Sequence, residues 1–469
     1  MKRVLVLGGG PAGYIAAATA ARLGAEVTLV EERELGGTCL NRGCVPTKAM
    51  VAAAARLAAV RGAAEFGVRV SGVEVDYGAL LARREAVTAQ LRQGVAHLLR
   101  ARKVKVVAGR ATLAGPGRLV VASGARLPDG SLAPEALELR GDAVVLASGS
   151  EPARLPLFDW DDPRVMTSDE LLRLEALPTS LAVVGGGVIG CEFASLFARL
   201  GTRVTVVELM DQLLPGEDRR AAQALRQAFR KAGIEVFTGS GVEAVEDAGA
   251  AGLRLRLAGG AEVVAERVLV SVGRQPRSRG LGYEEAGVRL DGRGFVAVDA
   301  SLRTSLPDVF AAGDVAGPPL LAHWAYHQGA LAAGNAVTGE RRRSDAAVVP
   351  SCVYSVPEVA SCGLTEDRAR AEGRDVEVAQ VRFNANSKAV IEGEADGFVR
   401  LVCEPGGGRV LGATLVGPHA TELVHEVALA VQAGVSLNEV AATIHAHPTL
   451  AEAVGEAALA GVGRGLHTL

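Results

Sequence analysis

The fold is decided by residues 4–13, VLVLGGGPAG, in which four apolar residues lead directly into a glycine-rich turn. Short apolar runs of this kind are typical of strands buried in a parallel sheet. A helix is predicted next, at residues 14–22, followed by a strand at residues 27–30 that leads to Glu31. The pattern therefore predicts a strand, a tight turn, a helix and a second strand in close succession.

The same unit returns at residues 181–190, LAVVGGGVIG, before a predicted helix at 191–200 and a strand at 204–207 that leads to Glu208. Both copies have the spacing Gly-x-Gly-x-x-Gly, with the glycines at Gly8, Gly10 and Gly13 and at Gly185, Gly187 and Gly190. The first glycine of such a set permits a tight turn, the second lets the backbone approach a pyrophosphate, and the third lets the helix pack on the strand. The helix N-terminus then faces the anion. Two dinucleotide sites are predicted, with tight packing alone as the alternative.

An acidic residue closes each unit. Glu31 and Glu208 can each accept hydrogen bonds from a ribose diol, which is the usual role of an acidic residue at this position. Glu208 is followed by Leu209-Met210-Asp211, with no arginine nearby to pair with a 2′-phosphate. The second site is therefore expected to prefer NADH over NADPH.

Two cysteines lie shortly after the first unit, in residues 35–48, LGGTCLNRGCVPTK. A disulfide between Cys39 and Cys44 would close a short loop, and strained disulfides are easier to reduce. Arg42 and Lys48 are cations that can stabilise a thiolate. A metal site and two inert cysteines are the alternatives. The other four cysteines are scattered singly and are expected in the core, so no four-ligand metal set is visible: Cys191, Cys352, Cys362 and Cys403.

The bulk composition narrows the class of protein. The net charge of -3 gives no general electrostatic reason to bind nucleic acid or an anionic membrane. No apolar run is long enough to suggest a membrane span. Six cysteines in 469 residues do not make a secreted disulfide scaffold, so a reduced, cytoplasmic setting is expected.

The cysteine segment at residues 36–48 resembles the active-site signature of the pyridine nucleotide-disulfide oxidoreductases. Ala147-Ser148-Gly149 is similar to the Ala-Thr-Gly turn of this family, and residues 273–276 match a further motif. Ala312-Gly313-Asp314 resembles its second FAD motif, in which the Asp bonds the ribitol chain. The resemblance implies FAD at the first site and NAD at the second. The residues that would hold them are Gly8, Gly10, Gly13, Glu31, Lys48, Ser148, Gly149, Gly313, Asp314, Gly185, Gly187, Gly190, Glu208 and Gly273.

The C-terminal part most resembles the dihydrolipoamide dehydrogenase branch of the family, through residues 445–452, HAHPTLAE. No cysteine lies in residues 463–469 and no arginine lies close after Glu208, which speaks against the mercuric and glutathione reductase branches. A related reductase that uses NAD(P)H, and a flavoprotein that acts mainly as an assembly component, remain alternatives. Three residues depart from the family pattern: Arg42, Ser148 and Trp324.

The resemblance also implies a division of labour. Cys39 would exchange with a dithiol substrate, Cys44 would face the flavin, and Lys48 would pair with Glu192 near the flavin. His447, oriented by Glu452, would take protons from the dithiol in the site of a partner subunit, so a homodimer is expected. Lipoyl domains and the acyltransferase core of a 2-oxo acid dehydrogenase complex are the expected partners, with the glycine cleavage system as another setting.

These expectations define a multidomain α/β protein, since 469 residues suffice for about three domains. Two Rossmann-like dinucleotide-binding domains are predicted, followed by a C-terminal α+β dimerisation domain. The expected bounds are residues 1–150 for the FAD domain, 151–275 for an inserted NAD domain, 276–345 for the return, and 346–469 for the interface domain. A helix is also predicted at residues 83–100.

Overall fold

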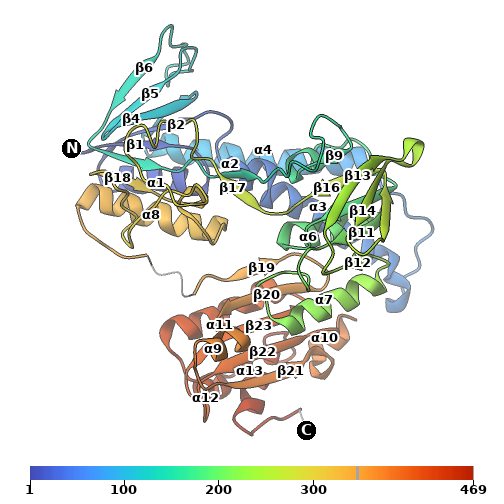
Figure 1. Ribbon diagram of the computed structural model, residues 1–469. Coiled ribbons are helices and arrows are strands. Elements are labelled where there is room, and N and C mark those ends of the chain that lie inside the picture. Colours follow the sequence, from blue (N-terminus) through green and yellow to red (C-terminus); the bar gives the residue numbers. More distant parts are fainter. Residues whose placement is uncertain (345–347, 468–469) are drawn as a thin grey trace.

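A five-stranded parallel sheet carries the first glycine-rich turn in the computed structural model, which describes residues 1–344 and 348–467 (Figure 1). Its strand order is β18-β7-β1-β2-β3. The strands are β1 (Arg3–Leu7), β2 (Glu26–Glu31), β3 (Lys105–Ala108), β7 (Ala143–Leu146) and β18 (Val309–Ala311). Helix α1 (Pro11–Arg22) buries a face of alanines, which lets it lie directly against α8 (Ala322–Thr338). Since β18 comes late in the sequence, the chain returns to this sheet after building the second unit.

A second five-stranded parallel sheet repeats the arrangement, with the order β12-β11-β10-β16-β9. Its strands are β9 (Val165–Met166), β10 (Ser180–Val184), β11 (Arg203–Val207), β12 (Glu235–Phe237) and β16 (Arg267–Val270). Its helices are α5 (Ser168–Leu171), α6 (Val188–Leu200) and α7 (Arg219–Lys231). The two inner strand pairs have the same parallel register, with Val6 opposite Leu29 and Val183 opposite Val206. The predicted duplication is therefore visible in the sheets.

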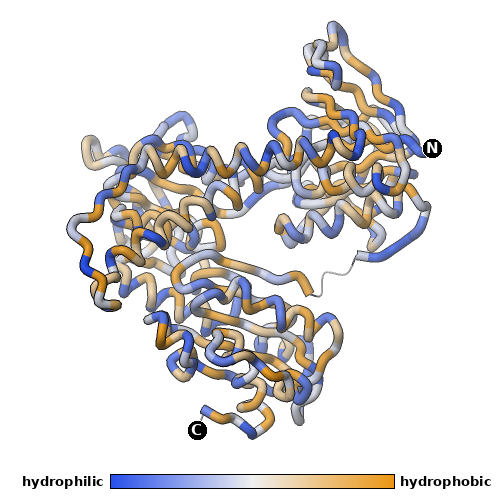
Figure 2. Tube along the Cα trace, turned by 180° about the vertical axis from the view of Figure 1, so that it is seen from behind, coloured by the Kyte–Doolittle hydropathy of each residue, from blue (hydrophilic) through white to orange (hydrophobic). Residues whose placement is uncertain are grey.

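Smaller sheets complete these two lobes. Three antiparallel strands extend the first lobe, β4 (Ala111–Gly115), β5 (Arg118–Val121) and β6 (Leu137–Arg140). Three more extend the second lobe, β13 (Val242–Asp247), β14 (Leu253–Leu257) and β15 (Glu262–Ala265). The lobes are joined by a two-stranded antiparallel ribbon, β8 (Ser150–Pro152) with β17 (Arg274–Pro276). Figure 2 shows hydrophobic stretches running through both lobes; the first lobe has a core of its own, whereas another core joins α3, the second lobe and the C-terminal sheet.

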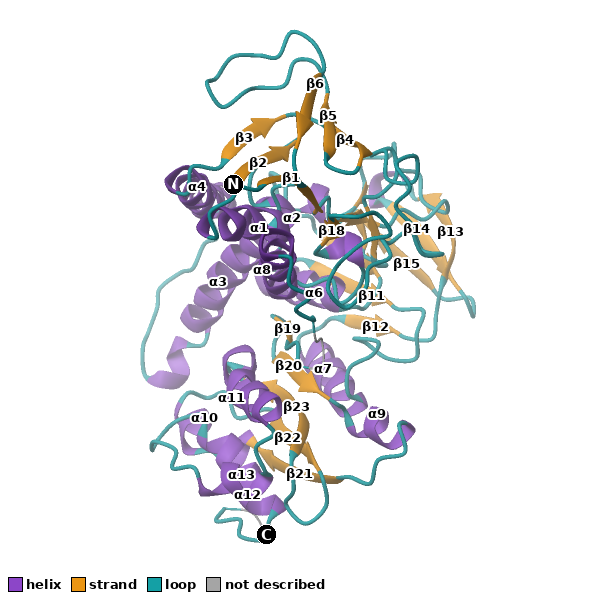
Figure 3. Ribbon diagram, turned by 90° about the vertical axis from the view of Figure 1, so that its left-hand side faces the viewer, coloured by secondary structure: helices purple, strands orange, loops and turns teal. Residues whose placement is uncertain are grey.

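The C-terminal lobe is an α+β unit around a five-stranded antiparallel sheet of order β19-β20-β23-β22-β21. Its strands are β19 (Ser351–Val353), β20 (Glu358–Gly363), β21 (Glu377–Arg382), β22 (Phe398–Cys403) and β23 (Val410–Gly417). Its helices are α9 (Glu366–Ala371), α10 (Ser387–Ile391), α11 (Ala420–Ala433), α12 (Leu437–Ala442) and α13 (Glu452–Gly461). Helices α11 and α13 cover one face of the sheet, while α7 and α9 lie toward the other (Figure 3). The predicted fold class is confirmed. The predicted domain bounds remain predictions, and the one at residues 345–346 falls outside the described residues.

Three helices connect the first turn to the rest of the molecule: α2 (Gly37–Arg42), α3 (Cys44–Arg61) and α4 (Tyr77–Ala101). By length and composition alone, residues Gly37–Arg61 could cross a membrane, contrary to the expectation from the sequence. The N-terminal part of the segment, with Cys39, Cys44 and Lys48, lines a large cavity of the protein.

Candidate functional site

A single large cavity brings most of the predicted site residues together. Its volume is about 1580 Å³, and it extends over both glycine-rich turns and reaches the C-terminal lobe. A pocket for one drug-sized ligand occupies roughly 300–1,000 Å³, so this cavity has room for more than one such ligand. The predicted residues that line it are Gly8, Gly10, Glu31, Cys39, Cys44, Lys48, Ser148, Gly149, Gly185, Gly187, Glu192, Glu208, Gly273, Gly313 and Asp314.

The third glycine of each turn does not line the cavity, because it serves packing. A Cβ atom on Gly13 would lie 1.8 Å from the carbonyl oxygen of Gly8, and one on Gly190 would lie 1.9 Å from that of Gly185. Neither backbone atom can give way without opening the turn. The first glycines, Gly8 and Gly185, have φ angles of +103° and +104°, which side chains rarely adopt. Both turns therefore require glycine for the same physical reasons.

Glu31 and Glu208 hold their turns in matching ways. Glu31 Oε2 accepts from the Gly9 N–H at 2.5 Å, and Glu208 Oε2 accepts from the Gly186 N–H at 2.6 Å. Each carboxylate still has unused lone pairs toward the cavity, since two oxygens offer about four acceptor sites. Each carboxylate can therefore still accept from a ribose hydroxyl, as predicted. It also stabilises the turn, a role that the sequence did not reveal.

The residues present fit two dinucleotides. Each turn places small, open backbone and a helix N-terminus on the cavity, which is what a pyrophosphate requires. Asp314 lies at the cavity wall, where Ser150 Oγ donates to its Oδ2 at 2.5 Å. The Ser148 hydroxyl, in contrast, donates to Arg277 O at 2.6 Å and accepts from Tyr283 at 2.9 Å. Its predicted role in binding would therefore fall to its main chain.

The two cysteines lie at the junction of α2 and α3, and both are free thiols. Cys44 is the first residue of α3, where the helix N-terminus favours a thiolate. The hydrogen bond from Cys39 lowers the pKa of Cys44 to about 7, with the Lys48 charge helping against burial. The same hydrogen bond and burial raise the pKa of Cys39. The pair is therefore electrostatically unequal: Cys44 is the more readily ionised thiol and Cys39 the less readily ionised one.

Lys48 and Glu192 meet as predicted. Lys48 Nζ lies 2.8 Å from Glu192 Oε2, and the Lys48 ammonium also sits 4.6 Å from the centre of the Tyr354 ring. Glu192 Oε1 accepts from the Tyr354 N–H at 3.0 Å. Burial opposes the charge on Lys48, but Glu192 and Cys44 outweigh it and raise the pKa of Lys48. Tyr354 was not predicted, since it comes from the C-terminal lobe and no local pattern marks it.

His447 and Glu452 form a pair but lie apart from the cavity of their own chain. His447 Nδ1 is 2.9 Å from Glu452 Oε1, and the His447 side chain is 68% exposed. Burial opposes ionisation of Glu452, but the Thr449 N–H and His447 lower its pKa. Neither residue lines the cavity that holds the cysteines. The pair is therefore available at the surface for a second subunit.

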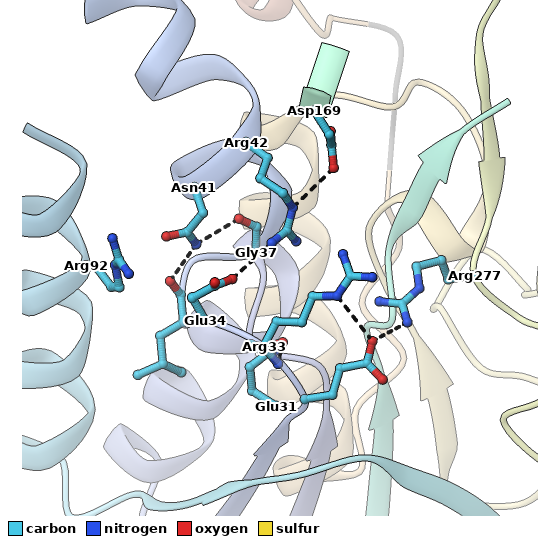
Figure 4. Close-up of polar contacts among 12 residues, drawn as sticks. Glu31, Arg33, Glu34, Gly37, Asn41, Arg42, Arg92, Asp169 and Arg277 are labelled. Atoms are coloured by element: carbon cyan, nitrogen blue, oxygen red, sulfur yellow. Dashed lines mark hydrogen bonds and ion pairs between the residues drawn. The ribbon is translucent and has the colours of Figure 1, made fainter. Parts of the chain in front are cut away.

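Two further departures from the family pattern, Arg42 and Trp324, have distinct structural outcomes. Arg42, which the sequence suggested as a cation for a thiolate, forms ion pairs with Glu34 and Asp169 and also lines the cavity (Figure 4). Trp324 is buried and stacks on His327, with ring centroids 5.2 Å apart, and does not line the cavity. Among the scattered cysteines, three are buried as expected, but Cys352 is only partly buried and lines the cavity.

Comparison with known proteins agrees with this site. The family model described as pyridine nucleotide-disulphide oxidoreductase matches residues 2–329, and the dimerisation domain of the same family matches residues 349–458. The chain is 40% identical over 465 residues to a dihydrolipoyl dehydrogenase of Chlamydia muridarum, covering 99% of this chain and 97% of the relative. It is 41% identical over 476 residues to one from Thermus scotoductus, covering 99% and 98%.

A solved structure shows the same fold. LpdA from Mycobacterium tuberculosis superposes with a TM-score of 0.89 at 31% identity, covering 98% of this chain and 99% of that protein. The predicted cofactors FAD and NAD are those of the family, and the presence of a dimerisation domain supports a homodimer. With two family models spanning nearly all of its length and full-length relatives at 40% identity, the chain belongs to the pyridine nucleotide-disulphide oxidoreductase family.

Proposed function

We propose that this chain oxidises dihydrolipoamide to lipoamide, with NAD+ as the final acceptor. The unequal pair Cys39 and Cys44 carries this proposal, because it lies in a cavity shared by two dinucleotide turns. Full-length relatives named dihydrolipoyl dehydrogenase support the choice of substrate. The second turn supports NAD+ as the acceptor, because no lysine or arginine stands beside Glu208 among the described residues that line the cavity near it: Leu209, Met210, Pro215, Ser240 and Gly241.

The cysteines divide the reaction between them. A substrate thiolate attacks Cys39 Sγ of the oxidised pair, the bond between the two sulfurs breaks, and Cys44 leaves as a thiolate. A leaving thiol of low pKa departs faster, and the N-terminus of α3 and the Lys48 charge both favour the Cys44 thiolate. The second substrate thiol then displaces Cys39, which gives the cyclic disulfide and leaves two electrons on the protein pair. Bound FAD supplies the two-electron relay from this pair to NAD+.

Proton removal falls to His447. Its imidazole would take the protons that the dithiol releases, and Glu452 orients the ring from Nδ1 at 2.9 Å. Because His447 is exposed and outside its own cavity, we place it in the cavity of the partner subunit. Catalysis would then require the dimer.

The same proposal implies the partners and the cellular setting of the protein. Lipoyl domains would deliver the dithiol on flexible arms, and the acyltransferase core of a 2-oxo acid dehydrogenase complex would hold the dimer. The glycine cleavage system is the other setting in which this substrate is reoxidised. A reducing cytoplasm fits the six cysteines, none of which forms a disulfide among the described residues.

Steady-state kinetics test the proposal. The purified protein, mixed with dihydrolipoamide and NAD+, is expected to form NADH, and Cys44→Ser is expected to abolish this. Lys105→Met, an exposed change on the first sheet, serves as the control. NADPH-dependent reduction of glutathione disulfide or mercuric ion, without activity toward lipoamide, would contradict the proposal and favour a related reductase.

A further inference from the structure

Two cations on either side of Cys44 both cross to the second nucleotide-binding unit. Lys48 Nζ lies 2.8 Å from Glu192 on α6, and Arg42 Nε lies 3.3 Å from Asp169 on α5. The cations belong to helices α3 and α2, which follow the first glycine-rich unit, whereas the carboxylates belong to the second lobe; α3 also packs on α6 in a shared hydrophobic core. The segment that carries both cysteines is therefore tied to the second lobe from both sides, and Arg42 provides the tie that has no part in the proposed chemistry.

The Arg42 guanidinium lies between two carboxylates (Figure 4). Its Nη1 is 2.9 Å from Glu34 in the loop before α2, on the opposite side from Asp169. The side chains of Arg42 and Asp169 are only 13% and 18% exposed. Removing one partner of such a shielded pair leaves a charge without compensation, which costs far more than losing a surface ion pair. Burial outweighs the neighbouring arginines and raises the pKa of Asp169, so we take the contact to act on the relative placement of α2 and α5, and not through its net contribution to stability.

The backbone around Asp169 is fixed by hydrogen bonds within the second lobe. Thr167 caps α5, its Oγ accepts from the Asp169 N–H at 3.2 Å, and Glu170 accepts from the Thr167 N–H at 2.9 Å. Strand β9 lies just before α5 and pairs with β16 of the second sheet. Asp169 therefore moves with the second sheet, whose strands end at the second glycine-rich turn.

Arg42 is held equally firmly to the first turn. The neighbouring Asn41 amide donates to Leu35 O and Gly37 O, both at 2.9 Å. The Gly36 N–H in turn donates to Gly9 O at 2.8 Å. A continuous set of contacts thus runs from the first turn, through the cysteine helix α2 and Arg42, to Asp169 and the second sheet.

We propose that Arg42 is a positioning residue that aligns α2 with the second nucleotide site through Asp169. The proposal rests on the proposed function and adds a residue to it. The Arg42 guanidinium is engaged by Glu34 and Asp169, so we expect it to act by alignment and to leave the exchange chemistry of Cys39 alone. The passage of electrons from the reduced protein to NAD+ needs the two lobes in place, and this is the step that depends on Arg42.

Rapid mixing of the FAD-loaded dimer separates the two half-reactions. Arg42→Leu and Asp169→Asn are expected to slow reoxidation by NAD+ roughly fivefold or more, the lower range of typical coupling between sites. Reduction by dihydrolipoamide is expected to stay within about twofold. Because both changes break one contact, the double variant is expected to be no slower than the slower single variant. Arg42→Lys is expected to rescue only part of the rate, since an ammonium cannot reproduce the two-sided contact of the guanidinium.

Hydrogen exchange provides a readout that needs no turnover. The amides of α5 are expected to exchange faster in Arg42→Leu than in the wild type. Arg61→Leu is the matched control, because Arg61 also crosses between the lobes, donating to Arg199 O at 3.0 Å, but at the far end of α3. It is expected to change neither half-reaction.

Equal slowing of both half-reactions, additive effects of Arg42→Leu and Asp169→Asn, or unchanged rates would each overturn the proposal. Asp169→Asn preserves shape and keeps the test valid if Arg42→Leu fails to fold. A wild-type protein that dihydrolipoamide cannot reduce would contradict the proposed function instead. Exchange at α5 would still decide whether Arg42 ties the lobes together.

Discussion

The two nucleotide-binding units share their turns and differ in the segments that come after them. In both, an acidic residue accepts from the middle of the turn, and the loop beyond it returns to the same turn. Gly36 N–H donates to Gly9 O in the first unit, and Leu214 N–H donates to Gly186 O in the second, both at 2.8 Å. The first loop then enters α2 with Cys39, whereas the second enters α7, which packs near the C-terminal sheet.

Their surroundings differ as well. The first turn is covered by its own loop, and Gly37 lies so close that a Cβ on it would be 2.6 Å from Gly10 Cα. The second turn is bordered by exposed apolar side chains, with Leu209 72% and Met210 52% exposed. The two turns therefore share one framework but differ in the segments that border them. The loop after the acidic residue, more than the turn itself, sets the difference.

Glycine substitutions test this comparison with the largest expected effect. Gly13→Ala and Gly190→Ala each drive a Cβ into the turn carbonyl, at 1.8 Å and 1.9 Å. Gly13→Ala is expected to lower bound flavin roughly tenfold, and Gly190→Ala to raise the KM for NAD+ roughly tenfold with flavin retained. Flavin absorbance and steady-state kinetics measure the two effects.

Gly94→Ala is the control, because a Cβ on Gly94 in α4 meets no atom within 4 Å. Loss of flavin from Gly190→Ala would contradict the separation of the two sites.

The acidic residues offer a smaller test. Glu208 is buried and accepts from Gly186 N–H at 2.6 Å and Met210 N–H at 2.7 Å. Glu208→Gln places an amide donor against one of these N–H groups, at a cost of about 1–3 kcal/mol. We expect a higher KM for NAD+ with unchanged flavin content, whereas Glu31→Gln is expected to weaken flavin binding. The exposed Glu235→Gln is expected to change neither, and identical phenotypes of the two main variants would break the comparison.

The smallest expected effect concerns the pKa of Cys44, the cysteine that follows the first unit. After the Cys39 hydrogen bond, Lys48 lowers and Glu192 raises the pKa of Cys44, which is about 7. Lys48→Met is therefore expected to move the pH midpoint of Cys44 alkylation upward, and Glu192→Gln to move it downward. Thiolate is lost as the pH falls through this pKa, so Lys48→Met slows alkylation at neutral pH. Shifts in the same direction for both variants would contradict the opposite effects of Lys48 and Glu192 on the pKa of Cys44.

Local patterns in the sequence were enough to predict both turns, their acidic residues and the cysteine pair, because each depends on neighbours in the chain. The helix predicted at 83–100 begins earlier, at Tyr77, since Asp76 caps it by accepting from the Ala79 N–H at 2.9 Å. Asp is a preferred residue at this position, so the earlier start of the helix could have been predicted from the sequence. The predicted fold and cofactors are those of the family.

Other features could not be predicted, because they arise where distant segments pack together. The Arg42–Asp169 contact joins residues far apart in the sequence, and neither residue lies in a pattern that names the other. The Tyr354 N–H reaches Glu192 from the C-terminal lobe, and Cys352 enters the cavity from the same strand region. The roles of the individual site residues remain predictions.

The exposed pair His447 and Glu452 has a genetic consequence. On the proposed arrangement, each active centre is encoded twice over, its sulfurs by one polypeptide and its imidazole by another. A chain with defective sulfurs and a chain with a defective imidazole, each inactive alone, would together assemble mixed dimers with one intact centre. Two recessive alleles of the same gene would then complement each other, and the unit of inheritance would be smaller than the unit of catalysis.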